Sequence, residues 1–78
     1  MDRLMQLAVN AEGFVFDPAG GEMFTVNKTG LGIIKGLQER KSDGMIADQL
    51  GETYGMPPEQ VEKDIFDFKS QLRLFKLI

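Results

Sequence analysis

The spacing of apolar residues changes once along this chain, near Asn27, and this change constrains the fold more than any other feature. Before Asn27 apolar residues recur with a period of two, which is typical of β-strands. After Asn27 they recur with the spacing of amphipathic helices. A chain of 78 residues holds one small domain, which we assign to residues 1–78. The sequence therefore predicts a single α+β domain in which strands precede helices.

Three short apolar stretches before Asn27 are predicted to be strands. Turn-rich segments separate them at residues 10–13 and 17–22. The second segment contains Pro18, whose φ is fixed, and Gly20 and Gly21, which adopt positive φ at little cost. We therefore expect a three-stranded antiparallel meander whose second and third strands form a hairpin. Its apolar positions are Met5, Leu7 and Val9, then Phe14 and Phe16, then Phe24 and Val26.

Three helices are predicted after Asn27, each with its own boundary signals. Asn27 is the N-cap candidate of the first helix, and Ser42 or Asp43 that of the second. Gly55 ends the second helix, and Pro58 suits the first turn of the third. The short turn between the last two helices predicts a helix-turn-helix. The apolar positions are Leu31, Ile34 and Leu37, then Ile46, Leu50 and Tyr54, then Val61, Ile65, Phe68 and Leu72.

Composition argues against several classes of function. Cysteine and histidine are absent, which removes the commonest general base and the usual metal ligands, so we expect no enzyme, no metal and no cofactor. The sequence shows no secretion signal and no long apolar run, so a cytoplasmic protein with no membrane partner is expected. Nine basic and twelve acidic residues give a net charge of −3. Since nucleic-acid binding requires a basic surface, no nucleic-acid partner is expected.

Two groups of residues invite a chemical interpretation. Gly30, Gly32 and Gly36 lie where a strand gives way to a helix, as in a dinucleotide-binding turn, but the spacing is wrong and no βαβ unit follows. Glycines that allow close helix packing are favoured instead. Asp64 and Asp67 are spaced to meet a metal, but no further oxygen ligand is near in sequence. We interpret them as part of a solvated helix face.

Phe66 lies off the apolar face of the third helix and shares a flank with Lys69 and Arg73. An exposed aromatic ring between two cations suits peptide docking, because the ring supplies apolar area and the cations attract acidic side chains. The alternative is that the meander or the N-terminus covers Phe66. Both interpretations remain open at the level of sequence.

The third strand is the second candidate surface. In a meander the last strand has one partner, so residues 23–27 leave a row of N–H and C=O groups unpaired. Neither proline nor lysine protects this edge before Lys28. The edge is therefore either an oligomer contact or a site where an extended peptide adds as a fourth strand.

The order and spacing of these residues resemble the PqqD family. The strand and turn at residues 13–24, followed by Val26-Asn27-Lys28-Thr29-Gly30, are similar to the family's signature leading into its first helix. The second and third helices also agree, through Ile46 and Leu50 and through Val61, Asp64, Phe68 and Leu72. The resemblance covers residues 7–78. Met45 stands where the family usually has Glu, and Leu74–Ile78 replace the Gly-Trp-like end common in pyrroloquinoline quinone (PQQ) synthesis.

The resemblance implies a winged-helix-like domain that recognises ribosomally synthesised, modified peptides. Family members bind the leader segment of a precursor peptide and present it to a modifying enzyme, often a radical S-adenosylmethionine enzyme. The leader adds to the edge of strand three and lies against helix three. We therefore predict non-catalytic leader binding in PQQ-type or related biosynthesis, by a monomer or homodimer. The predicted peptide-binding residues are Met23, Phe24, Thr25, Val26, Asn27, Phe66, Lys69 and Arg73.

Two other functions compete with this prediction. A small winged-helix DNA-binding regulator has the same order of elements, but here Glu59, Glu62, Asp64 and Asp67 would bring carboxylates towards phosphates. A structural dimer formed through the free strand edge is the other alternative.

Overall fold

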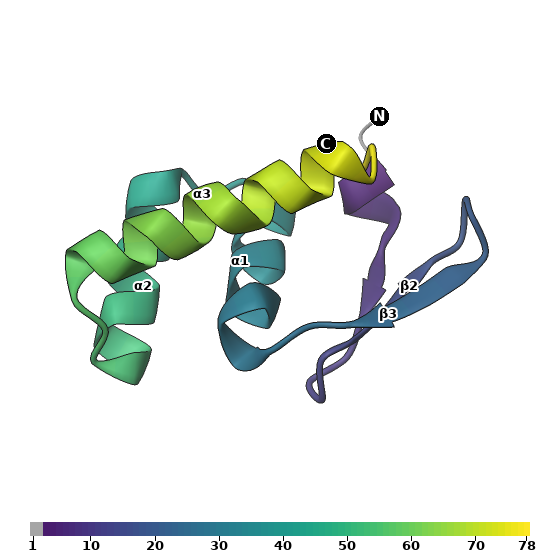
Figure 1. Cartoon of the computed structure of the whole chain (residues 1–78). Helices are drawn as coiled ribbons and strands as arrows, with labels where there is room; N and C mark the ends of the chain where they lie inside the picture. Colours follow the sequence, from purple (N-terminus) through teal and green to yellow (C-terminus); the bar gives the residue numbers. More distant parts are fainter. Residues whose placement is uncertain (1–2) are drawn as a thin grey trace.

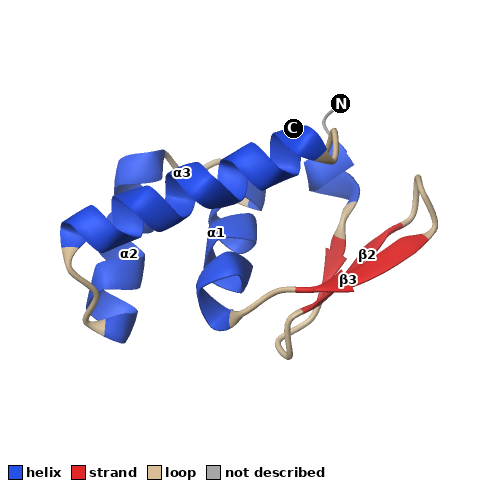
Figure 2. Cartoon of the chain, viewed as in Figure 1, coloured by secondary structure: helices blue, strands red, loops and turns tan. Residues whose placement is uncertain are grey.

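The computed structural model describes residues 3–78; residues 1 and 2 of the predicted domain lie outside this range. A 3₁₀ helix and three strands precede three α-helices (Figure 1): η1 Arg3–Gln6, β1 Ala8–Val9, β2 Phe14–Asp17, β3 Glu22–Thr25, α1 Lys28–Gln38, α2 Asp43–Tyr54 and α3 Pro58–Leu74. The strands form an antiparallel sheet in the order β1-β2-β3, placed at one end of the helices (Figure 2). The predicted winged-helix-like α+β architecture is confirmed.

The first strand is shorter than predicted. Met5 lies in η1, and only Ala8 and Val9 pair with β2. One 3₁₀ turn directs side chains three residues apart to the same side, and both Leu4 and Leu7 are buried. The Leu4 N–H donates to the Leu77 carbonyl at 3.0 Å. The N-terminal segment therefore folds as a helical turn because this arrangement packs two leucines against the end of the chain.

The predicted hairpin of β2 and β3 is confirmed, but β2 turns its other face to the core. Asp17 pairs with Glu22 across a turn in which Gly21 has φ of 71°. Val15 and Asp17 are buried, whereas Phe14 and Phe16 are exposed. The small Val15 side chain fits against α1 in the core, and the two aromatic rings lie on the outer face of the sheet.

Asp17 is a buried carboxylate with nearby partners. Only 3% of the residue is exposed. Arg3 forms an ion pair with it, and the Ala19 N–H donates to its Oδ1 atom at 3.1 Å. Because a buried charge is costly without a partner, Arg3 is needed to stabilise the position of the hairpin turn.

The predicted helix boundaries agree with the structure. The Asn27 side chain accepts a hydrogen bond from the Gly30 N–H at 2.8 Å, and the Ser42 hydroxyl accepts one from the Met45 N–H at 3.2 Å. Gly55 ends α2 in a left-handed conformation with φ of 65°. Each cap satisfies backbone groups that a helix end otherwise leaves unpaired.

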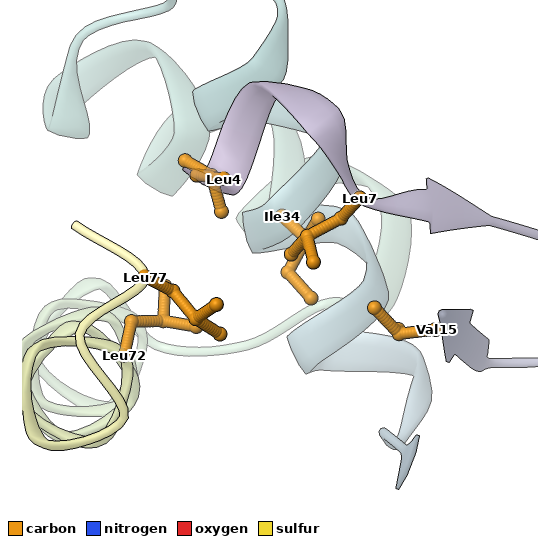
Figure 3. Close-up of a cluster of buried hydrophobic side chains, with 6 residues drawn as sticks. All are labelled: Leu4, Leu7, Val15, Ile34, Leu72 and Leu77. Carbon is orange, nitrogen blue, oxygen red and sulfur yellow. The ribbon is translucent and has the colours of Figure 1, made fainter. Parts of the chain in front are cut away.

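The core has two parts joined by α1 and α3. The first lies between η1, the sheet, α1 and the end of α3 (Figure 3), and consists of Leu4, Leu7, Val15, Ile34, Leu72 and Leu77. The second lies among the three helices and consists of Ile33, Ile46, Leu50, Val61 and Ile65. Leu37 and Phe68 pack against both parts. Tyr54, predicted on the apolar face of the second helix, is exposed.

The glycines of α1 lie against other helices. A Cβ atom at Gly32 would lie 2.8 Å from a Leu50 methyl carbon, and one at Gly36 would lie 2.6 Å from Ile46 Cγ1. A Cβ atom at Gly30 would lie 2.9 Å from the Phe68 ring. These contacts are shorter than van der Waals distance, so the glycines allow close packing of the helices, as the favoured interpretation states.

Candidate functional site

The outer edge of β3 carries unpaired backbone groups. Within residues 3–78, β3 has only β2 as a partner. The Val26 N–H donates to the Gly13 carbonyl at 2.8 Å. Backbone groups of successive residues point to opposite sides of a strand, so Phe24 also faces β2, and the N–H and C=O groups of Met23 and Thr25 point outward. Two residues of β3 can therefore bond an added strand.

A groove of about 540 Å³ lies between β3 and the C-terminal half of α3. Its residues come from β3, α3, the hairpin turn and both ends of the chain: Arg3, Asp17, Gly20, Glu22, Met23, Phe24, Thr25, Val26, Phe68, Gln71, Leu72, Phe75 and Leu77. Phe24, Val26 and Phe68 are half-buried, and Leu72 and Leu77 belong to the core. The groove therefore offers an apolar floor next to the open strand edge.

Apart from Thr25 of β3, polar side chains occupy two places in this groove. Arg3, Asp17 and Glu22 lie at the hairpin turn, where Arg3 and Asp17 pair with each other. Gln71 of α3 supplies an exposed amide along the opposite wall. A neutral amide both donates and accepts hydrogen bonds, so this wall can contact a polar group of a ligand without a charge on it.

The structure brings four of the eight predicted site residues together in the groove: Met23, Phe24, Thr25 and Val26. Asn27 lies next to it, in a shallower pocket of about 240 Å³ that also includes Gly30, Phe68 and Gln71. The Asn27 side chain is engaged as the N-cap of α1. Its contribution to ligand binding is therefore limited to its backbone and its remaining polar atoms.

Phe66, Lys69 and Arg73 lie elsewhere. They line a pocket of about 370 Å³ together with residues of α2, on the flank of α3 that does not face β3. Lys69 pairs there with Asp43 at 3.1 Å. Phe66 is 68% exposed, so within residues 3–78 neither the meander nor the N-terminal segment covers it, and that alternative is wrong. The three residues share one helix flank as predicted, but the structure does not place them beside strand three.

Sequence reasoning missed the residues of α3 and its C-cap, Phe75, that do face β3. Phe68, Gln71 and Phe75 follow the i, i+3, i+7 spacing of one helix face, and all three line the groove. This spacing is present in the sequence, but the apolar periodicity of the helix predicts only a core position for Phe68. It packs against both parts of the core and also lines the groove.

Among residues 3–78, no group of three or more acidic side chains is placed to hold a metal ion. No helix in this range is both long and apolar enough to cross a membrane.

Comparison with known proteins places this site in context. A solved structure titled "Lasso peptide synthetase B1 complexed with the leader peptide" has the same fold, with a TM-score of 0.75. It is 24% identical in sequence, and the similarity covers 91% of this chain and 85% of that one. The search of curated proteins gives no match. The family model described as coenzyme PQQ synthesis protein D (PqqD) matches residues 12–78. The chain therefore belongs to the PqqD family.

Proposed function

We propose that this protein binds the leader segment of a ribosomally synthesised precursor peptide by adding the leader to β3 as a fourth strand. The observation that carries the proposal is the outward orientation of the Met23 and Thr25 backbone groups beside the apolar groove. Membership of the PqqD family and a fold shared with a leader-bound synthetase support it.

Each part of the site has its own role in this proposal. An added strand exchanges main-chain hydrogen bonds with Met23 and Thr25, which hold the peptide without regard to its sequence. Side chains of the added strand alternate between two faces, so every second leader residue enters the groove. The residues that receive these side chains are Phe24 and Val26 of β3 and Phe68 of α3. We therefore expect the domain to select leaders that carry large apolar side chains at alternate positions.

The proposed role is that of a peptide chaperone without catalysis of its own. The domain presents the leader to a modifying enzyme, which we propose to be a radical S-adenosylmethionine enzyme in PQQ-type or related biosynthesis. Residues of the groove bind and orient the leader, and the modifying enzyme acts on the remainder of the precursor.

The decisive experiment removes one outward N–H group. Thr25→Pro deletes the donor that the added strand requires, in a position where an edge strand tolerates proline. Thr25→Val is the matched control, because it keeps the N–H group and a β-branched side chain. The probe is a fluorescein-labelled synthetic leader from a precursor gene next to this gene, and anisotropy gives its Kd. We expect about tenfold or greater weakening for Thr25→Pro and little change for Thr25→Val.

A second substitution checks the assigned orientation of the strand. The Phe24 N–H faces β2, so Phe24→Pro removes a hydrogen bond within the hairpin and lowers the melting temperature. Thr25→Pro leaves this ladder in place. Leader binding by folded Thr25→Pro with the affinity of the parent contradicts strand addition at β3.

A further inference from the structure

A second surface lies on the flank of α3 that faces away from β3. Two adjacent pockets, of about 370 and 570 Å³, share Lys69 and Arg73 as lining residues. The larger has apolar residues from three segments, Leu4 and Met5 of η1, Leu37 of α1 and Ile78 at the end of the chain, with Arg40 at its rim. The smaller adds Phe66, which is 68% exposed. We refer to both pockets together as the Arg73 surface.

The charge of the Arg73 surface is opposite to that of the chain. The chain carries −3, yet among residues 3–78 the larger pocket is lined by Arg40, Lys69 and Arg73 and by no acidic residue. Within residues 3–78, neither Arg40 nor Arg73 forms an ion pair. Lys69 pairs with Asp43 through partly exposed side chains, and an exposed pair of this kind is readily exchanged for another.

The backbone fixes Arg40 at the rim of this surface. Arg40 has φ of 61°, a left-handed conformation that favours glycine. Its N–H donates to the Leu37 carbonyl and the Lys41 N–H to the Gly36 carbonyl, both at 3.0 Å, which is the Schellman arrangement that ends α1. The backbone therefore places the Arg40 side chain at the larger pocket. Its left-handed conformation has a free-energy cost that glycine would avoid.

We propose that the Arg73 surface docks an acidic segment of a protein partner that carries large apolar side chains among its carboxylates. Carboxylates meet Arg40 and Arg73, and apolar side chains cover Phe66, Met5 and Ile78. The Arg73 surface lies on the flank of α3 that faces away from β3, so a partner bound there leaves the β3 groove open. The leader and this partner therefore bind to the domain at the same time.

The composition of the surface favours a protein segment over a polyanion. Arg40 and Arg73 pair in a bidentate manner with carboxylates and phosphates alike, and Asp43 and Glu62 of the smaller pocket repel both, so the apolar residues decide between the two. An apolar floor contributes nothing to binding a phosphate backbone. It does bury the apolar side chains of a peptide.

The test is a titration of the ¹⁵N-labelled protein with a short synthetic peptide in which Glu alternates with Leu and Phe. We expect amide shifts at Arg40, Lys69, Arg73 and Ile78, and weaker binding when salt screens the charges. A second peptide with Ser in place of Leu and Phe is expected to bind about tenfold more weakly. Both peptides carry the same charge, so the difference between their affinities measures the contribution of the apolar residues of the surface.

The test variant is Arg40→Gly combined with Arg73→Gln. Glycine relieves the left-handed conformation, so loss of binding in this variant does not reflect unfolding. We expect about tenfold weaker binding of the acidic, apolar peptide. The control, Lys28→Gln combined with Lys35→Gln, removes the same charge from exposed positions of α1 that do not line these pockets, and keeps the parent affinity.

Three results overturn the inference: amide shifts confined to the β3 groove, equal affinity for the Ser peptide or for a short DNA duplex, or no shifts at about millimolar peptide. Leader binding is measured separately on the same variant and is expected to be unchanged. A failure of leader binding in the parent therefore contradicts the proposed function alone, and leaves the Arg73 surface to be judged by its own peptide.

Discussion

Two exposed phenylalanines on opposite sides of α3 offer the sharpest test of which helix flank receives the leader. Phe66 is 68% exposed and Phe75 is 65% exposed. Phe75 follows Phe66 by nine positions, and at about 100° per residue this is about two and a half turns. Phe75 lines the β3 groove and Phe66 lines the Arg73 surface. We compare Phe75→Ala with Phe66→Ala.

The expected effects on stability are small and equal. Full burial of a phenylalanine side chain contributes about 1.5–3 kcal/mol, and since about one third of each residue is buried, each substitution costs about 0.5–1 kcal/mol. In a domain of this size, about 1 kcal/mol lowers the melting temperature by about 4–8 °C. Both variants should therefore remain folded, with similar melting temperatures.

The expected effects on leader binding differ. A leader in the β3 groove covers much of the exposed part of Phe75, so Phe75→Ala removes about 1–2 kcal/mol of contact, or about tenfold in Kd. Phe66→Ala leaves the groove intact and retains the parent Kd. Anisotropy of the labelled leader measures both. If Phe66→Ala weakens binding and Phe75→Ala does not, the leader lies on the opposite flank and our assignment of the groove is wrong.

Two further comparisons test the packing that supports the site. Gly36→Ala is expected to lower the melting temperature, because the added methyl group meets Ile46 at 2.6 Å and overpacking costs about 1–3 kcal/mol. Gly44→Ala, whose added methyl group makes an ordinary contact of 3.9 Å with the Ser42 hydroxyl, is expected to raise it, and a rise in both variants contradicts the packing argument. In denaturant unfolding, Arg3→Ala is expected to cost about 3 kcal/mol because it leaves Asp17 buried without its partner. Lys69→Ala breaks a partly exposed pair and is expected to cost at most about 1 kcal/mol, so equal losses contradict this account.

Local signals in the sequence predicted the elements well because their physical causes are local. Asn27, Ser42 and Gly55 act within one or two turns of their own helices, and the structure shows each in its predicted role. The face of β2 is different. Phe14, Val15 and Phe16 are all apolar. Both faces of β2 therefore carry apolar side chains, and the pattern does not show which face enters the core. Contact with α1 selects Val15, and that contact is tertiary.

The candidate site also has one part that the sequence predicts and one part that depends on tertiary packing. The free edge of β3 follows from the order of the strands, which predicts residues 23–27, and residues 23–26 line the groove. The flank of α3 that faces β3 depends on how α3 crosses the rest of the fold, which its own periodicity does not specify. Phe66, Lys69 and Arg73 form a genuine helix flank, but the crossing places Phe68, Gln71 and Phe75 beside the strand.

The end of the chain explains why the groove wall is already in place before a ligand binds. Lys76 has φ of 59°, its N–H donates to the Arg73 carbonyl, and the Leu77 N–H donates to the Leu72 carbonyl at 2.8 Å. This Schellman arrangement turns Leu77 back into the core beside Leu72, where its carbonyl accepts the Leu4 N–H. Phe75 lies between these fixed points. Because the wall is ordered by the fold, a leader that binds there does not bear the entropy cost of ordering it.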